Sequence, residues 1–221
     1  MGKMKNVPVP IIAVDFEGSR SVGIVEYGAA EFFGGELRAV RTRICRPDSR
    51  ISERDRALFD ISDADARACR PFSDDIDLFV DMRRRGVFCA HNASVEDSLL
   101  RAQAVSPGEV PDFVRGGTCV SWGPWLDSFA FCKNAYPSLD SAKLSNAVDA
   151  LGISGELDEL ALNFCPPGRR KWHCALFDAI ACGLIYARTC SSEGFEGVTL
   201  AWLAEQSGVK GASQRDFGQL V

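Results

Sequence analysis

The chain has 221 residues, of which 46% are hydrophobic and 25% charged, and its formal net charge is −5. This length fits one domain with a short appendage, and the ordinary globular composition excludes a disordered or fibrous chain. The negative net charge excludes a protein that coats nucleic acid as a bulk cation. A polyanionic ligand would therefore require a local basic patch or a bound metal ion.

Hydropathy and cysteine spacing exclude further classes of protein. No window approaches 18 apolar residues, so we expect no membrane span, and the short apolar run near the start lacks the cleavage site of a signal peptide. The nine cysteines are scattered, odd in number and form no CxxC motif, which excludes the common zinc and dithiol motifs. These features favour a reduced, cytoplasmic location.

Strands dominate the predicted first part of the chain. Apolar or alternating runs predict strands at 9–14, 23–30, 37–45 and 86–90, in that order. A loop with short helices is expected over 46–75, followed by a helix at 76–84. We expect the arginines at 83–85 to be a solvated helix end.

Helices dominate the rest. Apolar periodicity and end signals predict helices at 96–104, 127–134, 141–151, 173–187 and 199–206. A short strand at 119–122, a basic loop at 165–171 and a linker at 191–197 complete the pattern. This order of elements predicts an α/β fold with a mixed sheet.

Two carboxylates follow the first apolar run. The two-residue period of a strand puts Asp15 and Glu17 on one face and Phe16 on the other. Neighbouring carboxylates repel each other and are costly to bury unpaired, so a cation with oxygen ligands, Mg²⁺ or Mn²⁺, would relieve the cost. A strand that simply reaches solvent explains this motif, taken alone, equally well.

A second acidic motif follows the strand at 86–90. His91 and Asn92 end that strand, and Glu96 and Asp97 begin the next helix. Acidic residues are common at helix starts because they interact favourably with the helix dipole, which by itself explains this pair.

A third motif lies near the start of the helix at 173–187. His173 and Asp178 stand five residues apart, and both histidines of the chain belong to acid-containing motifs. Ala175, Ala179 and Gly183 recur every four residues, a stripe of small side chains that would let the helix approach a sheet closely.

Together these motifs resemble the three exonuclease motifs of the DEDD superfamily, in the subgroup whose third motif is His-x-x-x-x-Asp. Asp15 with Glu17 matches motif I, residues 90–100 resemble motif II, and His173 with Asp178 matches motif III. The resemblance covers residues 9–190. It implies a single ribonuclease H-like domain there, with a mixed β-sheet flanked by helices. Residues 191–221 lie outside the resemblance, and we expect them to form a C-terminal helical tail.

Two positions depart from the family pattern. The usual aspartate of motif II falls on Glu96, because Leu99 and Leu100 then match the family's Phe-Leu pair. We predict Glu96 as the motif II carboxylate, with Asp97 as the alternative. Motif I usually continues with Thr and Gly, whereas this chain continues with Gly18 and a serine.

The resemblance implies release of nucleoside 5′-monophosphates from the 3′ end of single-stranded nucleic acid, with DNA as the first choice, in repair or proofreading. It implies two Mg²⁺ ions, which Mn²⁺ would replace. Asp15 would bridge both ions. Glu17 and Asp178 would hold the ion nearer the attacking water, and Glu96 would support the other ion directly or through water. His173 would act as general base.

Five residues are candidate substrate contacts: Phe16, Gly18, His91, Asn92 and, in the basic loop, Arg170. Core packing of Phe16 and a solvated loop at 169–171 are the structural alternatives. The tail either docks on the domain through Trp202 and Leu203 or binds a protein partner.

Three other functions compete with a DNA exonuclease. An RNA-trimming exoribonuclease or oligoribonuclease-like enzyme fits the same motifs. A non-catalytic module that binds nucleic acid or a protein partner fits the altered motifs I and II, although it has little reason to keep Asp15, Glu17, His173 and Asp178. The third is a two-metal phosphoesterase acting on small substrates.

Overall fold

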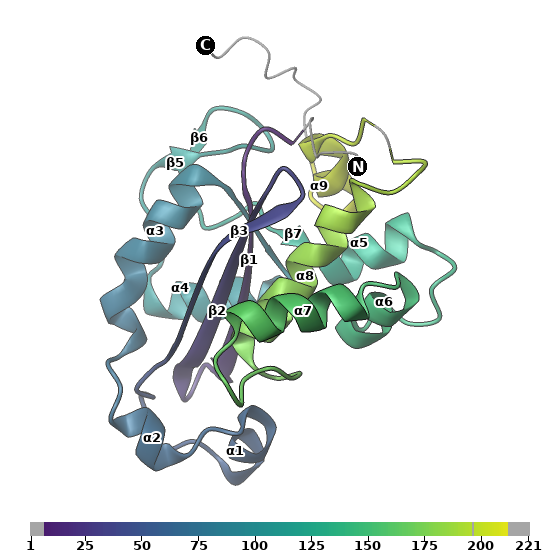
Figure 1. The fold of residues 1–221 in the computed structure, drawn as a ribbon. Coiled ribbons are helices and arrows are strands. Elements are labelled where there is room, and N and C mark those ends of the chain that lie inside the picture. The colour runs from purple at the N-terminus through teal and green to yellow at the C-terminus, as the bar shows by residue number, and fades with distance from the viewer. Residues whose placement is uncertain (1–6, 196, 212–221) are drawn as a thin grey trace.

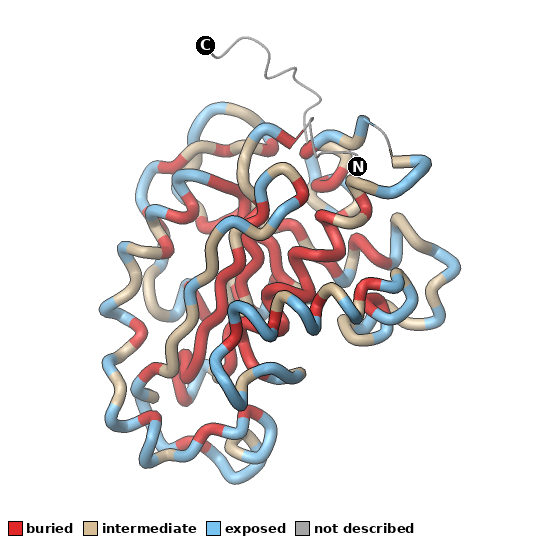
Figure 2. Tube along the Cα trace, in the orientation of Figure 1, coloured by how far each residue is buried: buried red, intermediate tan, exposed pale blue. Residues whose placement is uncertain are grey.

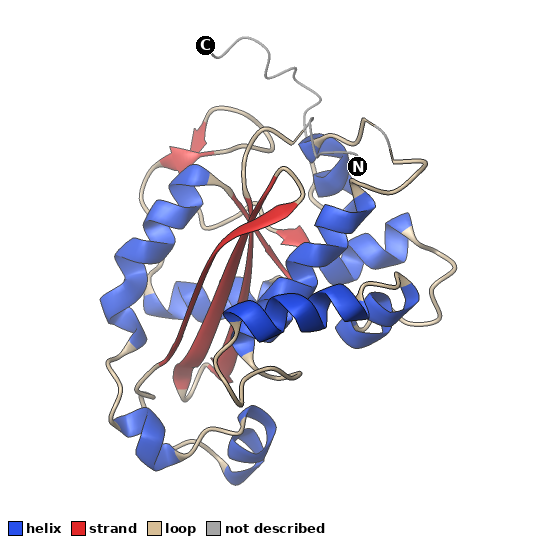
Figure 3. Ribbon diagram, in the orientation of Figure 1, coloured by secondary structure: helices blue, strands red, loops and turns tan. Residues whose placement is uncertain are grey.

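A five-stranded mixed sheet forms the centre of the computed structural model, which describes residues 7–195 and 197–211 (Figures 1 and 3). The order is β3-β2-β1-β4-β7; the first three strands pair antiparallel, whereas β4 runs parallel to β1 and β7 parallel to β4. The strands are β1 (Ile11–Ser19), β2 (Gly23–Phe33), β3 (Glu36–Ile44), β4 (Val87–Ala90) and β7 (Leu126–Asp127). A separate pair consists of β5 (Val110–Pro111) and β6 (Thr118–Cys119).

Helices cover both faces of the sheet (Figure 1). One side carries α3 (Ile76–Arg85) and α4 (Ser94–Gln103), and the chain reaches them through α1 (Glu53–Phe59), α2 (Asp63–Arg67) and a 3₁₀ helix (Phe72–Asp75). The other side carries α5 (Ser128–Ala135), α6 (Leu144–Ala150), α7 (Ser154–Phe164) and α8 (Ala175–Thr189). The last described helix is α9 (Leu200–Gln206).

Strand β1 divides the core into two parts. Ile11 and Ala13 belong to the cluster under α8, whereas Ile12, Val14 and Phe16 belong to the cluster under α3 and α4. The predicted alternation is confirmed, and it continues beyond the predicted end of the strand because β1 extends through Ser19. Asp15 and Glu17 therefore lie within a strand, on the α8 face.

Helix α8 is the most deeply buried helix among those described, with every residue buried except Arg188 (Figure 2). It lies unusually close to the sheet. A Cβ on Gly28 of β2 would come 2.2 Å from the Ala175 carbonyl carbon, and one on Gly183 would come 2.2 Å from the Phe32 ring. The predicted close approach is confirmed, and it presses the start of α8 against the acidic strand β1.

The structure corrects the expectation for Arg83. Its side chain is only 1% exposed, and its guanidinium donates to the carbonyls of Trp122 (2.9 Å), Gly123 (2.8 Å) and Pro111 (2.8 Å). Only the following two arginines are exposed. Arg83 is buried because its guanidinium satisfies the carbonyl of Pro111 in β5 and two carbonyls of the loop that leads to β7.

Two further segments bear on the sequence predictions. Helix α7 occupies residues for which the sequence analysis predicted no element. In the tail, Leu203 is buried and Trp202 packs edge-to-face on Phe131 at 5.9 Å, so the docking prediction is confirmed for α9. Residues 212–221 lie outside the described residues, and a partner for the tail stays a prediction.

Two predicted absences concern the described part of the chain. No helix there combines the length and the apolar character that a membrane span requires. All nine cysteines are described, and each is free.

Candidate active site

Four carboxylates from three elements meet beside α8. Asp15 and Glu17 come from β1, Glu96 from the first turn of α4, and Asp178 from the first turn of α8. Asp15 is half-buried, and the other three side chains are at most 8% exposed. Two of them, Asp15 and Asp178, line a cavity of about 590 Å³. Its other walls are His91, Asn92, Phe129, Lys143, Leu144, Ser145, Trp172 and His173.

Burial and repulsion from neighbouring carboxylates raise the pKa of all four carboxyl groups. Burial is the largest cause in each case. It raises the pKa of Glu17 and Glu96 to about 8 and that of Asp178 to about 7. The pKa of Asp15 rises well above its usual value because the charges of Asp178, Glu17 and Glu96 act on it as well. Without a counter-charge this cluster is electrostatically costly near neutral pH.

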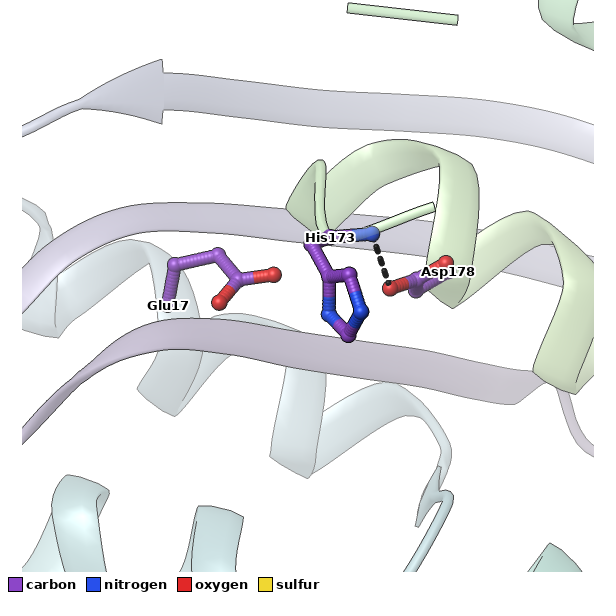
Figure 4. A group of neighbouring side chains, drawn as sticks. All are labelled: Glu17, His173 and Asp178. Carbon is purple, nitrogen blue, oxygen red and sulfur yellow. Dashed lines mark hydrogen bonds between the residues drawn. The ribbon is translucent and has the colours of Figure 1, made fainter. Parts of the chain in front are cut away.

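Two buried oxygens in the cluster have no hydrogen-bond donor. They are Oε2 of Glu96 and Oδ1 of Asp178. Buried carboxylate oxygens without partners are rare and cost free energy, and a divalent cation would satisfy them. Glu17, His173 and Asp178 also each present one ligand atom, all within 4.8 Å of one another (Figure 4). The residues present therefore fit a divalent metal ion.

The two acids of motif II have different partners. Both oxygens of Asp97 accept hydrogen bonds, one from Arg101 Nε at 2.6 Å and one from Trp125 Nε1 at 2.9 Å. Glu96 is 5% exposed, and its pKa responds to the charge of Glu17. Of the two candidates, the structure brings Glu96 into the acidic cluster.

His173 precedes α8 in a left-handed backbone conformation, with φ of 64°. This conformation is uncommon for a residue with a side chain. Its backbone N–H donates to Asp178 Oδ2 at 3.0 Å, which fixes the backbone of His173 relative to α8. The imidazole points between the carboxylates of Glu17 and Asp178 (Figure 4). His173 is exposed, so water and ligands reach it.

Solved structures match this fold, whereas no protein-family model and no curated protein sequence matches the chain. Exonuclease X in complex with 5′ overhanging duplex DNA has 20% sequence identity and a TM-score of 0.61, covering 90% of this chain and 99% of that one. The nuclease domain of 3′hExo, a DEDDh family member bound to rAMP, has 15% sequence identity and a TM-score of 0.61. The match covers 84% of this chain and 94% of that one. The chain has the fold of the DEDDh exonucleases.

The likeness extends to part of a larger protein of this fold. The zinc-bound complex of E. coli ExoI with single-stranded DNA has 14% identity and a TM-score of 0.61. The match covers 84% of this chain but only 41% of that one. The ribonuclease H-like α/β fold expected from the sequence is thereby confirmed.

On this DEDDh fold, the loop before His173 is held by a buried ion pair. Arg169 Nε donates to Glu26 Oε1 at 3.0 Å, and its Nη2 contacts Oε2 of the same carboxylate. Glu26 Oε2 also accepts the N–H of Ala175, at 3.1 Å, and Glu26 is the cross-strand partner of Glu17. The positive charge of Arg169 lowers the pKa of Glu17, opposing the effect of burial.

The other cations of the basic loop also have partners inside the protein. Lys171 Nζ pairs with Asp60 Oδ2 at 2.7 Å. Arg170 Nε donates to the carbonyl of Cys165 at 3.2 Å, and Arg170 is not among the residues lining the cavity. The expected solvated loop is therefore wrong for Arg169, whose charge is paired with buried Glu26, whereas Arg170 and Lys171 are exposed to solvent.

Two predicted substrate contacts, Phe16 and Gly18, are not among the residues that line the cavity. Phe16 is 5% exposed, and its ring packs on Phe72 and Phe79 at centroid distances of 5.6 and 5.5 Å, so a stacking role for this side chain is wrong. Phe16 directly follows Asp15 in the strand, so its side chain points to the opposite face of the sheet. Gly18 has a φ of 151°, and a Cβ there would lie 2.2 Å from the Gly23 carbonyl oxygen, so it serves close strand contact at a β-bulge.

His91 and Asn92 do line the cavity; His91 Nδ1 is hydrogen-bonded to Ser128 Oγ at 2.8 Å, and Asp127 holds the backbone at Asn92. Oδ1 and Oδ2 of Asp127 accept the N–H groups of Asn92 and Ala93 at 3.0 and 3.2 Å, and Asp127 also caps α5. Sequence reasoning gave Asp127 no role in the site. The sequence signal that could have singled out Asp127 is its position just before a helix, where an aspartate commonly acts as the N-cap.

Proposed function

We propose that this protein is a metal-dependent 3′–5′ exonuclease that hydrolyses single-stranded nucleic acid, preferentially DNA, and releases nucleoside 5′-monophosphates. The observation that carries the proposal is the buried cluster of four carboxylates, two of them with partnerless oxygens, beside an exposed histidine. A protein that only binds nucleic acid has no physical reason to keep so costly a cluster.

The carboxylates are the proposed metal ligands. Asp15 takes the central position, since its pKa responds to the charges of the three others. Glu17 and Asp178 bind on the side of His173, and Glu96 binds on the side of α4. When bound, two Mg²⁺ ions, or Mn²⁺ in their place, would polarise the substrate phosphate and lower the pKa of the attacking water.

His173 is the proposed general base. Its side chain is exposed at the cavity, and its backbone N–H donates a hydrogen bond to Asp178, which is also a proposed metal ligand. Imidazole accepts a proton from water near neutral pH and passes it to solvent. The Arg169–Glu26 ion pair holds the loop that carries it.

The cavity offers surfaces for a terminal nucleotide. Its volume of about 590 Å³ lies within the usual range of small-ligand sites. Trp172 and Phe129 present aromatic surface there, on which a base of any sequence can stack. His91 and Asn92 supply polar groups at the same wall.

An RNA-trimming exoribonuclease is the second candidate. The reason is specific: the 3′hExo nuclease domain, which shares this fold, was solved with rAMP bound. The ligands of the other two structures, overhanging duplex DNA and single-stranded DNA, support DNA instead.

The test is degradation of 5′-labelled single-stranded DNA and RNA of one sequence, with Mg²⁺ or Mn²⁺, beside an Asp15→Ala control. We expect a ladder of labelled products shortening from the 3′ end, faster for DNA and absent in the control. A faster RNA ladder would select the second candidate. No ladder on either strand would reject an exonuclease.

A further inference from the structure

A second cavity, of about 420 Å³, adjoins the candidate active site. It shares Phe129 and Lys143 with the first cavity, so the two cavities meet at these side chains, and the second cavity with these two shared residues is called the groove. Its other walls come from α5 and the α5–α6 connection, at one edge of the molecule in Figure 1, and include Lys133, Tyr136 and Asp140.

The groove carries the unpaired positive charge of this region. Lys133 and Lys143 are exposed, and among the described residues neither forms an ion pair. By contrast, Arg169 and Lys171 of the basic loop are paired with Glu26 and Asp60. A polyanion that enters the active site therefore meets available ammonium groups along α5 and α6 rather than on the loop of His173.

Phe129 stands where the two cavities meet. Its side chain is 37% exposed and lines both cavities, so part of the ring is available to a ligand. Lys133 Nζ lies 5.5 Å from the centroid of this ring. An aromatic surface flanked by ammonium groups is the combination that binds single strands without sequence preference, because bases stack while lysines contact phosphates.

We propose that this groove binds the strand upstream of the 3′-terminal nucleotide. Phe129 stacks on a base at the junction, and Lys133 and Lys143 each contact a phosphate. This proposal rests on the proposed exonuclease function. It implies that the enzyme's preferred substrate is a single strand longer than a dinucleotide. Asp140 is the one carboxylate among the residues lining the second cavity, and it opposes binding there.

The first experiment measures binding and requires no hydrolysis. Fluorescence anisotropy of a 5′-labelled oligothymidylate of about twelve nucleotides is recorded in EDTA and in Ca²⁺, over a series of KCl concentrations. The double variant Lys133→Gln/Lys143→Gln is expected to lower the slope of log K against log[KCl] by about 1.4, since each single-strand phosphate contact contributes about 0.7. Asp140→Asn should tighten binding.

A matched control removes two exposed charges elsewhere. Arg38→Gln/Arg84→Gln changes the net charge equally, on β3 and α3, and should keep the wild-type slope. Phe129→Ala should weaken binding about five- to 150-fold, the range measured for loss of a stacking aromatic. An unchanged slope in the lysine variant, or equal losses in both double variants, would overturn the groove proposal.

The second experiment compares hydrolysis of the same oligomer with that of a dinucleotide. In the lysine variant, kcat/KM should fall at least about five-fold more for the oligomer than for the dinucleotide. Equal losses on both would overturn the groove proposal while leaving the exonuclease in place. Lysine-dependent binding by a protein that hydrolyses neither substrate would support the groove and reject the exonuclease.

Discussion

Arg169 and Glu26, 143 residues apart in the chain, form a buried ion pair directly behind the acidic cluster. Glu26 is 3% exposed and opposes Glu17 across the β1–β2 ladder, and its carboxylate also accepts the first N–H of α8. One pair thus joins β2, α8 and the His173 loop. Arg169 also donates to the Phe59 carbonyl at 2.6 Å, which attaches α1 to the same loop.

Loss of Arg169 should be strongly destabilising. Arg169→Ala leaves the Glu26 carboxylate buried without a counter-charge, and breaking such a pair costs about 3–5 kcal/mol. Urea denaturation measures the free energy of unfolding. Lys171→Ala breaks the neighbouring but exposed pair with Asp60 and should change stability little. Similar losses in the two variants would contradict a buried anchor at Arg169.

Gly28 should tolerate no side chain. In Gly28→Ala the new Cβ would meet the Ala175 backbone, so α8 and the adjacent His173 must move, at a cost of about 1–3 kcal/mol. Gly155→Ala is the matched control, because the same methyl group on α7 meets open space and should stabilise by about 0.5–1 kcal/mol. Thermal denaturation and nuclease activity report both effects; a Gly28→Ala protein as stable and active as wild type would contradict the close approach.

Glu96 and Asp97 should differ sharply on substitution. Glu96→Gln removes a carboxylate of the acidic cluster and should lower kcat about 100-fold or more, because substitutions at metal sites have effects of this size. Asp97→Asn weakens contacts with Arg101 and Trp125 outside the cavity and should change kcat only a few-fold. Steady-state kinetics decide between them. The reverse ranking would make Asp97 the motif II carboxylate.

The metal-free protein should lose stability as the pH rises from about 4 to about 8. The folded pKa values of Glu17 and Glu96 (about 8) and Asp178 (about 7) exceed unfolded values near 4, so in this range the folded state binds more protons than the unfolded state. The contribution of these groups is full below their unfolded pKa values and is lost as the pH rises through the folded ones.

Differential scanning fluorimetry in EDTA tests this dependence. The Glu96→Gln/Asp178→Asn variant should show a flatter decline of Tm between pH 5 and pH 8 than wild type. Mn²⁺ should raise Tm more at pH 8 than at pH 5, because protons compete with the metal for the same oxygens. A metal-independent Tm at both pH values would exclude a cation site in this cluster.

Local patterns in the sequence predicted the acidic site well. The two-residue period of β1 places Asp15 and Glu17 on one face, and the same period already places Phe16 on the other, in the core. The register of motif II pointed to Glu96, which the structure brings into the cluster. Each of these features depends on residues a few positions apart.

Features that depend on distant residues were not predictable in the same way. The partners of Arg169 and Lys171 lie more than 100 residues away, and the carbonyls that Arg83 contacts, in β5 and in the loop before β7, lie 28–40 residues further along the chain. Helix α7 begins at Ser154, and its N-cap residue, Ile153, has no side chain that can cap it, so the usual start signal is missing. Tertiary contacts, rather than local propensity, determine these positions.

The most direct test of the central claim identifies the product. Wild-type protein and the Asp178→Asn variant are incubated with single-stranded DNA and Mn²⁺, and the small products are separated and weighed by mass spectrometry over time. The two-metal exonuclease predicts nucleoside 5′-monophosphates, released in order from the 3′ end by wild type and lost in the variant. Nucleoside 3′-monophosphates, internal fragments, or equal release by the variant would contradict it.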